Sequence, residues 1–320
     1  MIGRASWSGF LPMGIIPAMN RSRPPAALLI LLLSLAGCSR YLPSLLRPAP
    51  TATATAMPAP TITPIPLAAS VNGQPITLAA YERELLRFET AEQAAGTDLA
   101  TLGTYRDQVL SAMIDLELLA QGARSQGLST DPAEIDQRYA KLVSELGDES
   151  SFQSWLTVQG FTQDELRASL EEQVLGAKMV ELIVEGVPQV VEQVHARHIL
   201  VASRAEAEDV QAMLASGADF ATLANQVSLD ISTRLAGGDL GWFPQGYLRL
   251  PQVDQAAFAL QPGEISGVVE SELGFHIVQT LERGEHLADV DVQRWLREQA
   301  VQGWLDQQRE NAAIELFITP

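Results

Sequence analysis

The sequence predicts an α+β protein in which a small strand-containing domain interrupts a helical one. Three observations support this prediction. Residues 69–190 show helical periodicity, residues 191–286 alternate short apolar runs with helical segments, and residues 287–320 return to one long amphipathic helix. At 320 residues the chain is long enough for about two domains.

Residues 1–38 have the layout of a signal peptide. Arginines precede a largely apolar run of ten residues, AALLILLLSL, which is too short to span a bilayer but suits a signal-peptide core. The run ends in LAGC, which resembles a lipobox, and Cys38 is the only cysteine of the chain. We expect Cys38 to carry a lipid; an ordinary secretory signal with an incidental cysteine is the alternative. Met19 is a plausible true start.

Residues 39–68 are rich in Pro, Thr and Ala, as in RPAPTATATAMPAPTITPIP. Such a composition cannot bury a core and favours extended, polyproline-like backbone. The segment is interpreted as a tether that holds the folded body away from a membrane surface. A mucin-like stalk is the alternative, and both place the body outside the cytoplasm.

Residues 69–190 are predicted to form a helical, chaperone-like domain. Its helices are recognised by capping residues and by apolar positions that share a face. The expected helix starts are Thr77, about Leu102, Pro132 and the capping box of Thr162 and Glu165. Histidine and cysteine are absent from this region, and its acidic residues fall on solvent faces. The region therefore contains no catalytic constellation.

Residues 191–286 show a different pattern, in which predicted strands alternate with predicted helices. HARHILVA predicts a strand, two amphipathic helices follow, and a glycine-rich stretch, AGGDLGWFPQGY, precedes a short helix and two strand-like runs. The element order is β-α-α-β-α-β-β, which describes a compact α+β domain.

The last predicted element is one amphipathic helix from Asp289 to about Asn311. It carries two tryptophans, Trp295 and Trp304, which need a larger apolar partner surface than a small domain offers. We therefore expect this helix, within residues 287–320, to pack on the N-terminal helices and complete their domain.

The net charge and the positions of the histidines limit the classes of function that the chain can have. A formal net charge of −18 argues against a nucleic-acid partner, because such a partner needs basic surface. The four histidines are His195, His198, His276 and His286. A histidine in a strand is ordinarily a satisfied core imidazole. Metal binding is not expected, because His195 and His198 should lie on opposite faces of a strand. Two imidazoles on neighbouring strands, His198 and His276, could instead hydrogen-bond each other.

Five motifs, in order, resemble the parvulin-type peptidyl-prolyl isomerases: HARHILV, FATLANQVSLDIST, GGDLGWF, AAFALQPGEIS and SELGFHIV. The resemblance covers about residues 195–283. It implies a four-stranded antiparallel sheet with surrounding helices, inserted into the helical domain. The signal peptide, the segment VNGQPIT and the C-terminal helix further resemble the PrsA- and SurA-like extracytoplasmic foldases.

The resemblance also implies the site. His198 and His276 match the paired histidines at its centre, and Asp230 matches a position occupied by Cys or Asp. Aspartate makes a covalent role unexpected, so Asp230 is interpreted as an electrostatic group with a raised pKa. Ser271 matches a hydroxyl that bonds a histidine or the backbone. Asp239 is interpreted as a structural hydrogen-bonding residue.

The expected substrate pocket is apolar. Leu240 and Leu248 match walls of a proline pocket, and Phe243 adds aromatic surface. Val253 stands where the family often has an aromatic residue, and the segment 246–258 is one residue longer than usual. This departure implies a shallower pocket.

The function implied is peptidyl-prolyl isomerisation without a cofactor, through stabilisation of a twisted X–Pro amide. The expected partners are unfolded or partly folded exported polypeptides, and the expected location is extracytoplasmic, with a lipid anchor in a bacterial membrane. No basic loop lies near the site, so selectivity for a phosphorylated residue is not expected. The alternative is a tethered holdase chaperone with a weak or inactive isomerase domain. A solute-binding lipoprotein fits poorly, because the repeated β-α pattern of a two-lobed binding fold is missing.

Overall fold

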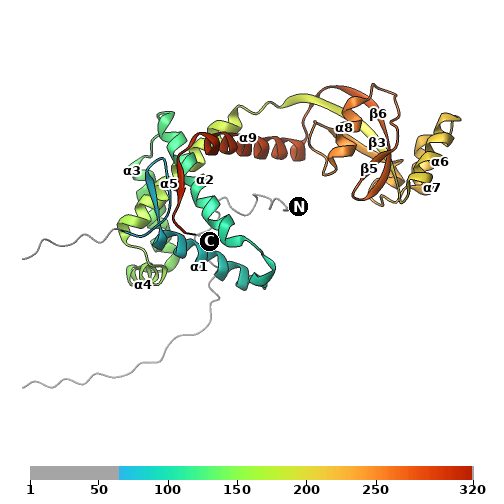
Figure 1. The fold of residues 1–320 in the computed structure, drawn as a ribbon. Coiled ribbons are helices and arrows are strands. Elements are labelled where there is room, and N and C mark those ends of the chain that lie inside the picture. Colours follow the sequence, from blue (N-terminus) through green and yellow to red (C-terminus); the bar gives the residue numbers. More distant parts are fainter. Residues whose placement is uncertain (1–64, 319–320) are drawn as a thin grey trace, which may run out of the picture. The chain divides into compact units, whose positions relative to one another are not determined.

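The computed structural model describes residues 65–318, which are drawn in colour in Figure 1. They divide into two compact units. Within the described range, the first unit contains residues 65–70, 74–110 and 316–318. The second contains residues 71–73 and 111–315. The predicted signal peptide, Cys38, Met19 and nearly all of the predicted tether lie outside the described residues.

The first unit contains most of a three-stranded sheet with strand order β2-β1-β7. The strands are β1 (Leu67–Val71), β2 (Gln74–Thr77) and β7 (Ile314–Leu316), and the helices are α1 (Leu78–Ala94), η2 (Leu99–Thr101) and the start of α2 (Tyr105–Ser125). Thr77 caps α1, as predicted, by accepting a hydrogen bond from the Ala80 amide at 3.1 Å. The sequence predicted only a turn at Asn72 and Gly73. Both residues do have positive φ, but the turn connects two strands of a sheet.

The second unit contains the remaining helices outside the small domain: α3 (Pro132–Leu146), α4 (Glu149–Gln159), α5 (Gln163–Glu185) and α9 (Val290–Asn311). Pro132 occupies the first turn of α3, and Thr162 and Glu165 form the predicted capping box of α5. Helix α4 was not predicted, because its serines and β-branched residues are weak helix formers. Tertiary packing stabilises it: Phe152 is fully buried, with its ring edge-on to Tyr139.

Helix α9 packs on α5 and α2, which confirms the expected return to the N-terminal helices. Arg309 donates to the Asp115 carboxylate at 2.6 Å, and this aspartate is buried rather than on the solvent face that the sequence predicted. Trp304 occupies space that only a glycine leaves open, since a Cβ on Gly122 would lie 2.6 Å from its ring. Trp295 was expected on the same surface, but its ring is edge-on to Tyr247, which follows β4.

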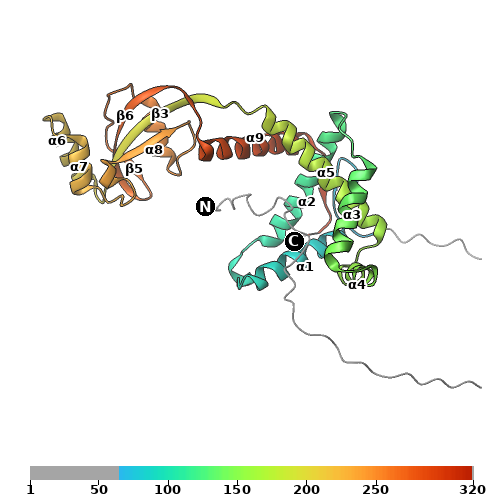
Figure 2. The same ribbon diagram turned by 180° about the vertical axis from the view of Figure 1, so that it is seen from behind.

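The predicted α+β domain is present, with an antiparallel sheet of strand order β4-β3-β6-β5. Its elements are β3 (Val190–Val201), α6 (Arg204–Ala215), α7 (Phe220–Val227), η3 (Arg234–Ala236), β4 (Asp239–Phe243), α8 (Pro251–Ala259), β5 (Val269–Ser271) and β6 (Gly274–Leu287). Helices α6 and α7 lie on one side of the sheet and α8 on the other (Figures 1 and 2).

The two faces of this sheet carry separate cores. Ile199 and Ile277 belong to the core under α6 and α7, whereas Ala196 and Val278 belong to the core under α8. Side chains alternate along a strand, so a residue two positions from Ala196 or Val278 shares the α8 face. The residues in question are His198 and His276. The strands thus place both imidazoles next to the α8 core.

The glycine-rich stretch brings its backbone against β3. Gly238 has φ +83°, and its carbonyl accepts from the His198 amide at 2.9 Å. A Cβ on Gly238 would lie well inside van der Waals contact with the His198 carbonyl. Only glycine meets both conditions, as the sequence predicted for this stretch.

We predict that Gly238→Ala destabilises the chain far more than Gly241→Ala. Both glycines have positive φ (+83° and +73°), but a Cβ on Gly241 meets nothing within 4 Å. Gly241→Ala should therefore cost only the left-handed backbone conformation, about 1–2 kcal/mol in the free energy of unfolding. Urea unfolding of both variants measures the difference. Equal losses would contradict the close approach at His198.

Candidate active site

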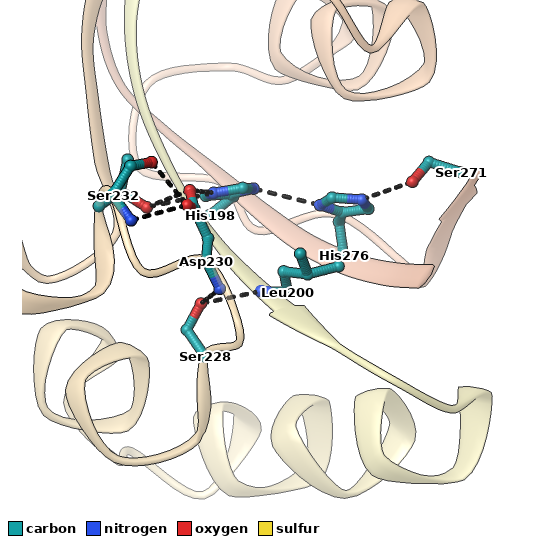
Figure 3. A network of polar contacts seen from close by, with 8 residues as sticks. His198, Leu200, Ser228, Asp230, Ser232, Ser271 and His276 are labelled. Atoms are coloured by element: carbon teal, nitrogen blue, oxygen red, sulfur yellow. Dashed lines mark hydrogen bonds and ion pairs between the residues drawn. The ribbon is translucent and has the colours of Figure 1, made fainter. Parts of the chain in front are cut away.

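Two buried histidines from neighbouring strands contact each other directly. In the pairing of β3 with β6, His198 lies opposite Val278 and Leu200 lies opposite His276. The two Nδ1 atoms are 3.1 Å apart, and the rings are stacked with an angle of 17° between their planes. His276 is fully buried and His198 nearly so. This contact, seen in Figure 3, is the hydrogen bond that the sequence predicted.

Asp230 lies at one end of the histidine pair, in the segment after α7. Its Oδ2 is 2.8 Å from His198 Nε2 and accepts from the Thr233 hydroxyl at 2.6 Å. Its Oδ1 accepts from both the amide and the hydroxyl of Ser232. The Ser228 hydroxyl ties this segment to β3, because it accepts from the amides of Leu200 and Asp230. The carboxylate is therefore held on all sides.

Ser271 lies at the other end of the pair, at the end of β5. Its Oγ is 2.7 Å from His276 Nε2 and accepts from the Leu273 amide at 3.1 Å. Asp230, His198, His276 and Ser271 thus form one row of hydrogen-bonded side chains (Figure 3).

The row fits one assignment of tautomers for neutral rings. An ionised Asp230 only accepts, so His198 donates from Nε2 and, as a neutral ring, accepts at Nδ1. His276 then donates from Nδ1 and accepts at Nε2 from the Ser271 hydroxyl. In this assignment every polar atom of the row has a partner.

The electrostatics agree with this assignment. Burial by itself would raise the pKa of Asp230, but hydrogen bonds from Ser232, Thr233 and His198 outweigh it and hold the pKa well below its usual range. The expected raised pKa of Asp230 is therefore wrong. Burial, and then the neighbouring His198, lower the pKa of His276 to about 4. The row therefore combines a fixed negative charge at Asp230 with a buried imidazole, His276, that resists protonation.

This arrangement suits a reaction that makes no covalent bond. The four donors around Asp230 occupy its oxygens and hold the carboxylate in place. The lowered pKa of His276, about 4, makes this ring a weak base for the Ser271 hydroxyl, which disfavours serine as a nucleophile. Within residues 65–318, no group of three or more His, Cys, Asp or Glu side chains is placed to hold a metal ion.

Comparison with known proteins gives two family matches. Residues 183–282 match a PPIC-type PPIASE domain of the rotamase family, and residues 52–180 match a SurA-like N-terminal domain. Over 228 residues the chain is 31% identical to the foldase protein PrsA of Caldanaerobacter subterraneus subsp. tengcongensis, covering 66% of this chain and 72% of the relative. The chain belongs to the PrsA foldase family.

Two further matches are a chaperone, found by its sequence, and a peptidylprolyl isomerase, found by its solved structure. The chaperone SurA of Nitrosococcus oceani is 34% identical over 156 residues, which cover 43% of this chain and 36% of that protein. The solved peptidylprolyl isomerase PrsA of Bacillus cereus aligns over 78% of this chain and 93% of that one, with 20% identity and a TM-score of 0.44. This PrsA-family chain is a folding assistant built around a PpiC-type isomerase domain.

The structure gathers the predicted pocket residues of this foldase into the core under α8. Phe243 and Val253 are buried in that core, whereas Leu240 and Leu248 pack against it and are only partly buried. The two leucines are therefore the members whose side chains are partly accessible at the surface. Asp239 does not join the row: it accepts from the Gly241 amide and lies 2.7 Å from His195 Nε2, which confirms its structural role.

Sequence reasoning missed three hydroxyl residues of the site, namely Ser228, Ser232 and Thr233. All three lie within three residues of Asp230 in the motif SLDIST. Serine or threonine two or three positions after an aspartate is the pattern of a local turn that the carboxylate caps. This signal was available in the sequence.

We predict that His276 contributes stability that is lost as the pH is lowered from about 6.5 to about 4. The pKa of His276 is about 4 in the folded chain against an ordinary 6.5, so the unfolded chain binds more protons in this window. His276 should contribute a slope of up to about 1.4 kcal/mol per pH unit, which ends below pH 4. Urea unfolding across this range, with His276→Gln as the comparison, measures the contribution. Equal slopes in both proteins would contradict the lowered pKa.

Proposed function

We propose that this chain accelerates cis/trans exchange at X–Pro bonds in unfolded or partly folded exported polypeptides, with Asp230, His198, His276 and Ser271 as its polar centre. The observation that carries the proposal is the continuous hydrogen-bonded row on the α8 face of the sheet. Leu240 and Leu248 supply accessible apolar surface on that face, with Phe243 and Val253 beneath them.

The chemistry required is rotation about a partial double bond. The uncatalysed barrier is about 18–20 kcal/mol, because resonance keeps the amide planar. Twisting localises the lone pair on the prolyl nitrogen and reduces the polarity of the carbonyl. An enzyme must favour this state over either planar form. A dry apolar surface for the ring, beside imidazoles of fixed tautomer and orientation, would do so without reorganising during the step.

Asp230 acts in this proposal through His198. Its oxygens are occupied by Ser232, Thr233 and His198, so the carboxylate is a fixed charge that holds the imidazole in one tautomer. Val253 fills the core with less volume than an aromatic residue would. The pocket is correspondingly shallow, which bears on turnover more than on the fold.

We also propose an extracytoplasmic, lipid-anchored setting. The PrsA and SurA relatives support an extracytoplasmic foldase. The lipobox-like LAGC ending in Cys38 and the Pro-rich tether of residues 39–68 support a lipid anchor. No helix within residues 65–318 is long and apolar enough to cross a membrane. The domain boundaries that fit this arrangement are 69–190 for the helical domain, 191–286 for the isomerase domain and 287–320 for the closing helix.

We predict that the chain accelerates exchange in a proline-containing peptide and that Asp230→Asn lowers kcat/KM at least about tenfold, because the fixed charge is lost. The matched control is Asp219→Asn, which removes a similar carboxylate that caps α7. Magnetisation-exchange NMR measures both. If the unmodified chain leaves exchange at its uncatalysed rate yet suppresses aggregation of an unfolded protein, the holdase alternative replaces this proposal.

We predict that Cys38→Ala releases the chain from membranes. The thiol is the only one in the sequence, so its removal leaves no cysteine for lipid attachment. Fractionation of cells that express each form measures the distribution. Unchanged membrane attachment of the variant would contradict the lipid anchor.

A further inference from the structure

A buried carboxylate outside the histidine row holds the segment that carries Leu248. Asp254 lies in the first turn of α8, and only 3% of it is exposed. Its Oδ1 accepts from the Gly246 amide at 2.9 Å, and its Oδ2 accepts from the amides of Gly246 at 3.0 Å and Leu248 at 3.2 Å. Within residues 65–318, no ion pair includes this carboxylate. Backbone amides alone stabilise it.

A buried carboxylate that is bonded only by backbone amides needs a physical explanation. Burying a charged group is costly, and hydrogen bonds offset that cost only where their geometry is maintained. A carboxylate that merely favoured the start of α8 would do so at the exposed surface, as Asp219 does for α7. Asp254 instead points back to the segment before the helix.

The segment that Asp254 binds has few other hydrogen bonds. Residues 244–250 form no helix or strand, and the backbone hydrogen bond within them runs from Tyr247 to Pro244 at 3.3 Å. Gly246 has φ +85°, a backbone conformation that residues other than glycine rarely adopt. The carboxylate is therefore the main polar restraint on the position of Leu248.

We propose that Asp254 is a positioning residue for the substrate pocket. It holds the 246–248 backbone so that Leu248, like Leu240, packs on the core under α8, and the resulting apolar surface is ready before substrate binds. This inference rests on the proposed isomerase function. It goes further in assigning substrate affinity to a side chain that touches neither the substrate nor the histidine row.

The test uses Asp254→Asn in the full chain. The amide replaces one carboxylate oxygen by an NH2 group that faces the Gly246 amide in either orientation, so the hold on the 246–248 backbone is weakened. We expect KM for a proline peptide to rise at least about fivefold while kcat changes less than twofold. Asp219→Asn, which makes the same carboxylate-to-amide change at the cap of α7, away from the pocket, should leave both constants unchanged.

A double-mutant cycle separates positioning from a general structural role. If Asp254 acts through Leu248, then Asp254→Asn should change KM little in a Leu248→Ala background. Effects on KM that multiply, or an Asp254→Asn variant that is only less stable, would overturn the inference. An inactive unmodified chain would instead overturn the proposed function itself.

Amide hydrogen exchange on the unmodified chain gives a readout that needs no variant. The amides of Gly246 and Leu248 should exchange as slowly as those of α8, despite lying in a segment without regular structure. Fast exchange at Leu248 would overturn the inference even if Asp254→Asn fails to fold.

Discussion

The hydrogen bond between His198 and His276 is the constraint on which the rest of the site depends. It joins two imidazoles that the pairing of β3 with β6 places on one face of the sheet. His276 is fully buried and His198 is only 5% exposed, so each ring must find its partners within the protein. Every other polar group of the row follows from that requirement. Asp230 accepts from the outer nitrogen of His198, and Ser271 donates to the outer nitrogen of His276.

The surrounding backbone also helps to maintain the contact between His198 and His276. Gly238 lets the chain approach the His198 carbonyl, and Ser228 ties the Asp230 segment to β3. Three hydroxyl or amide donors then saturate Asp230, which therefore stays ionised. Asp230 is therefore a charged group that orients the His198 ring and does not itself bind the substrate. The same device recurs at Asp254, where backbone amides rather than side chains surround the carboxylate.

Strand-based parts of the site were predictable and loop-based parts were less so. His198 and His276 could be paired from sequence, because strand periodicity gives the face and neighbouring strands give the distance. The electrostatics of Asp230 were predicted with the wrong sign, because the pKa depends on whether donors or apolar groups surround the carboxylate. Those donors, Ser232 and Thr233, lie beside it in the sequence, yet only the folded turn directs them at it.

By itself, the sequence determined the element order of the α+β domain, the caps at Thr77 and Thr162, the histidine pair and the family resemblance. These depend on local periodicity, local hydrogen bonding and motif spacing. Only the tertiary structure decided that β7 joins β1 and that α4 is a helix. It also decided that Trp304 and Trp295 have different partners and that Asp254 holds Leu248. Each depends on contacts between residues far apart in the chain or on burial, neither of which a local pattern contains.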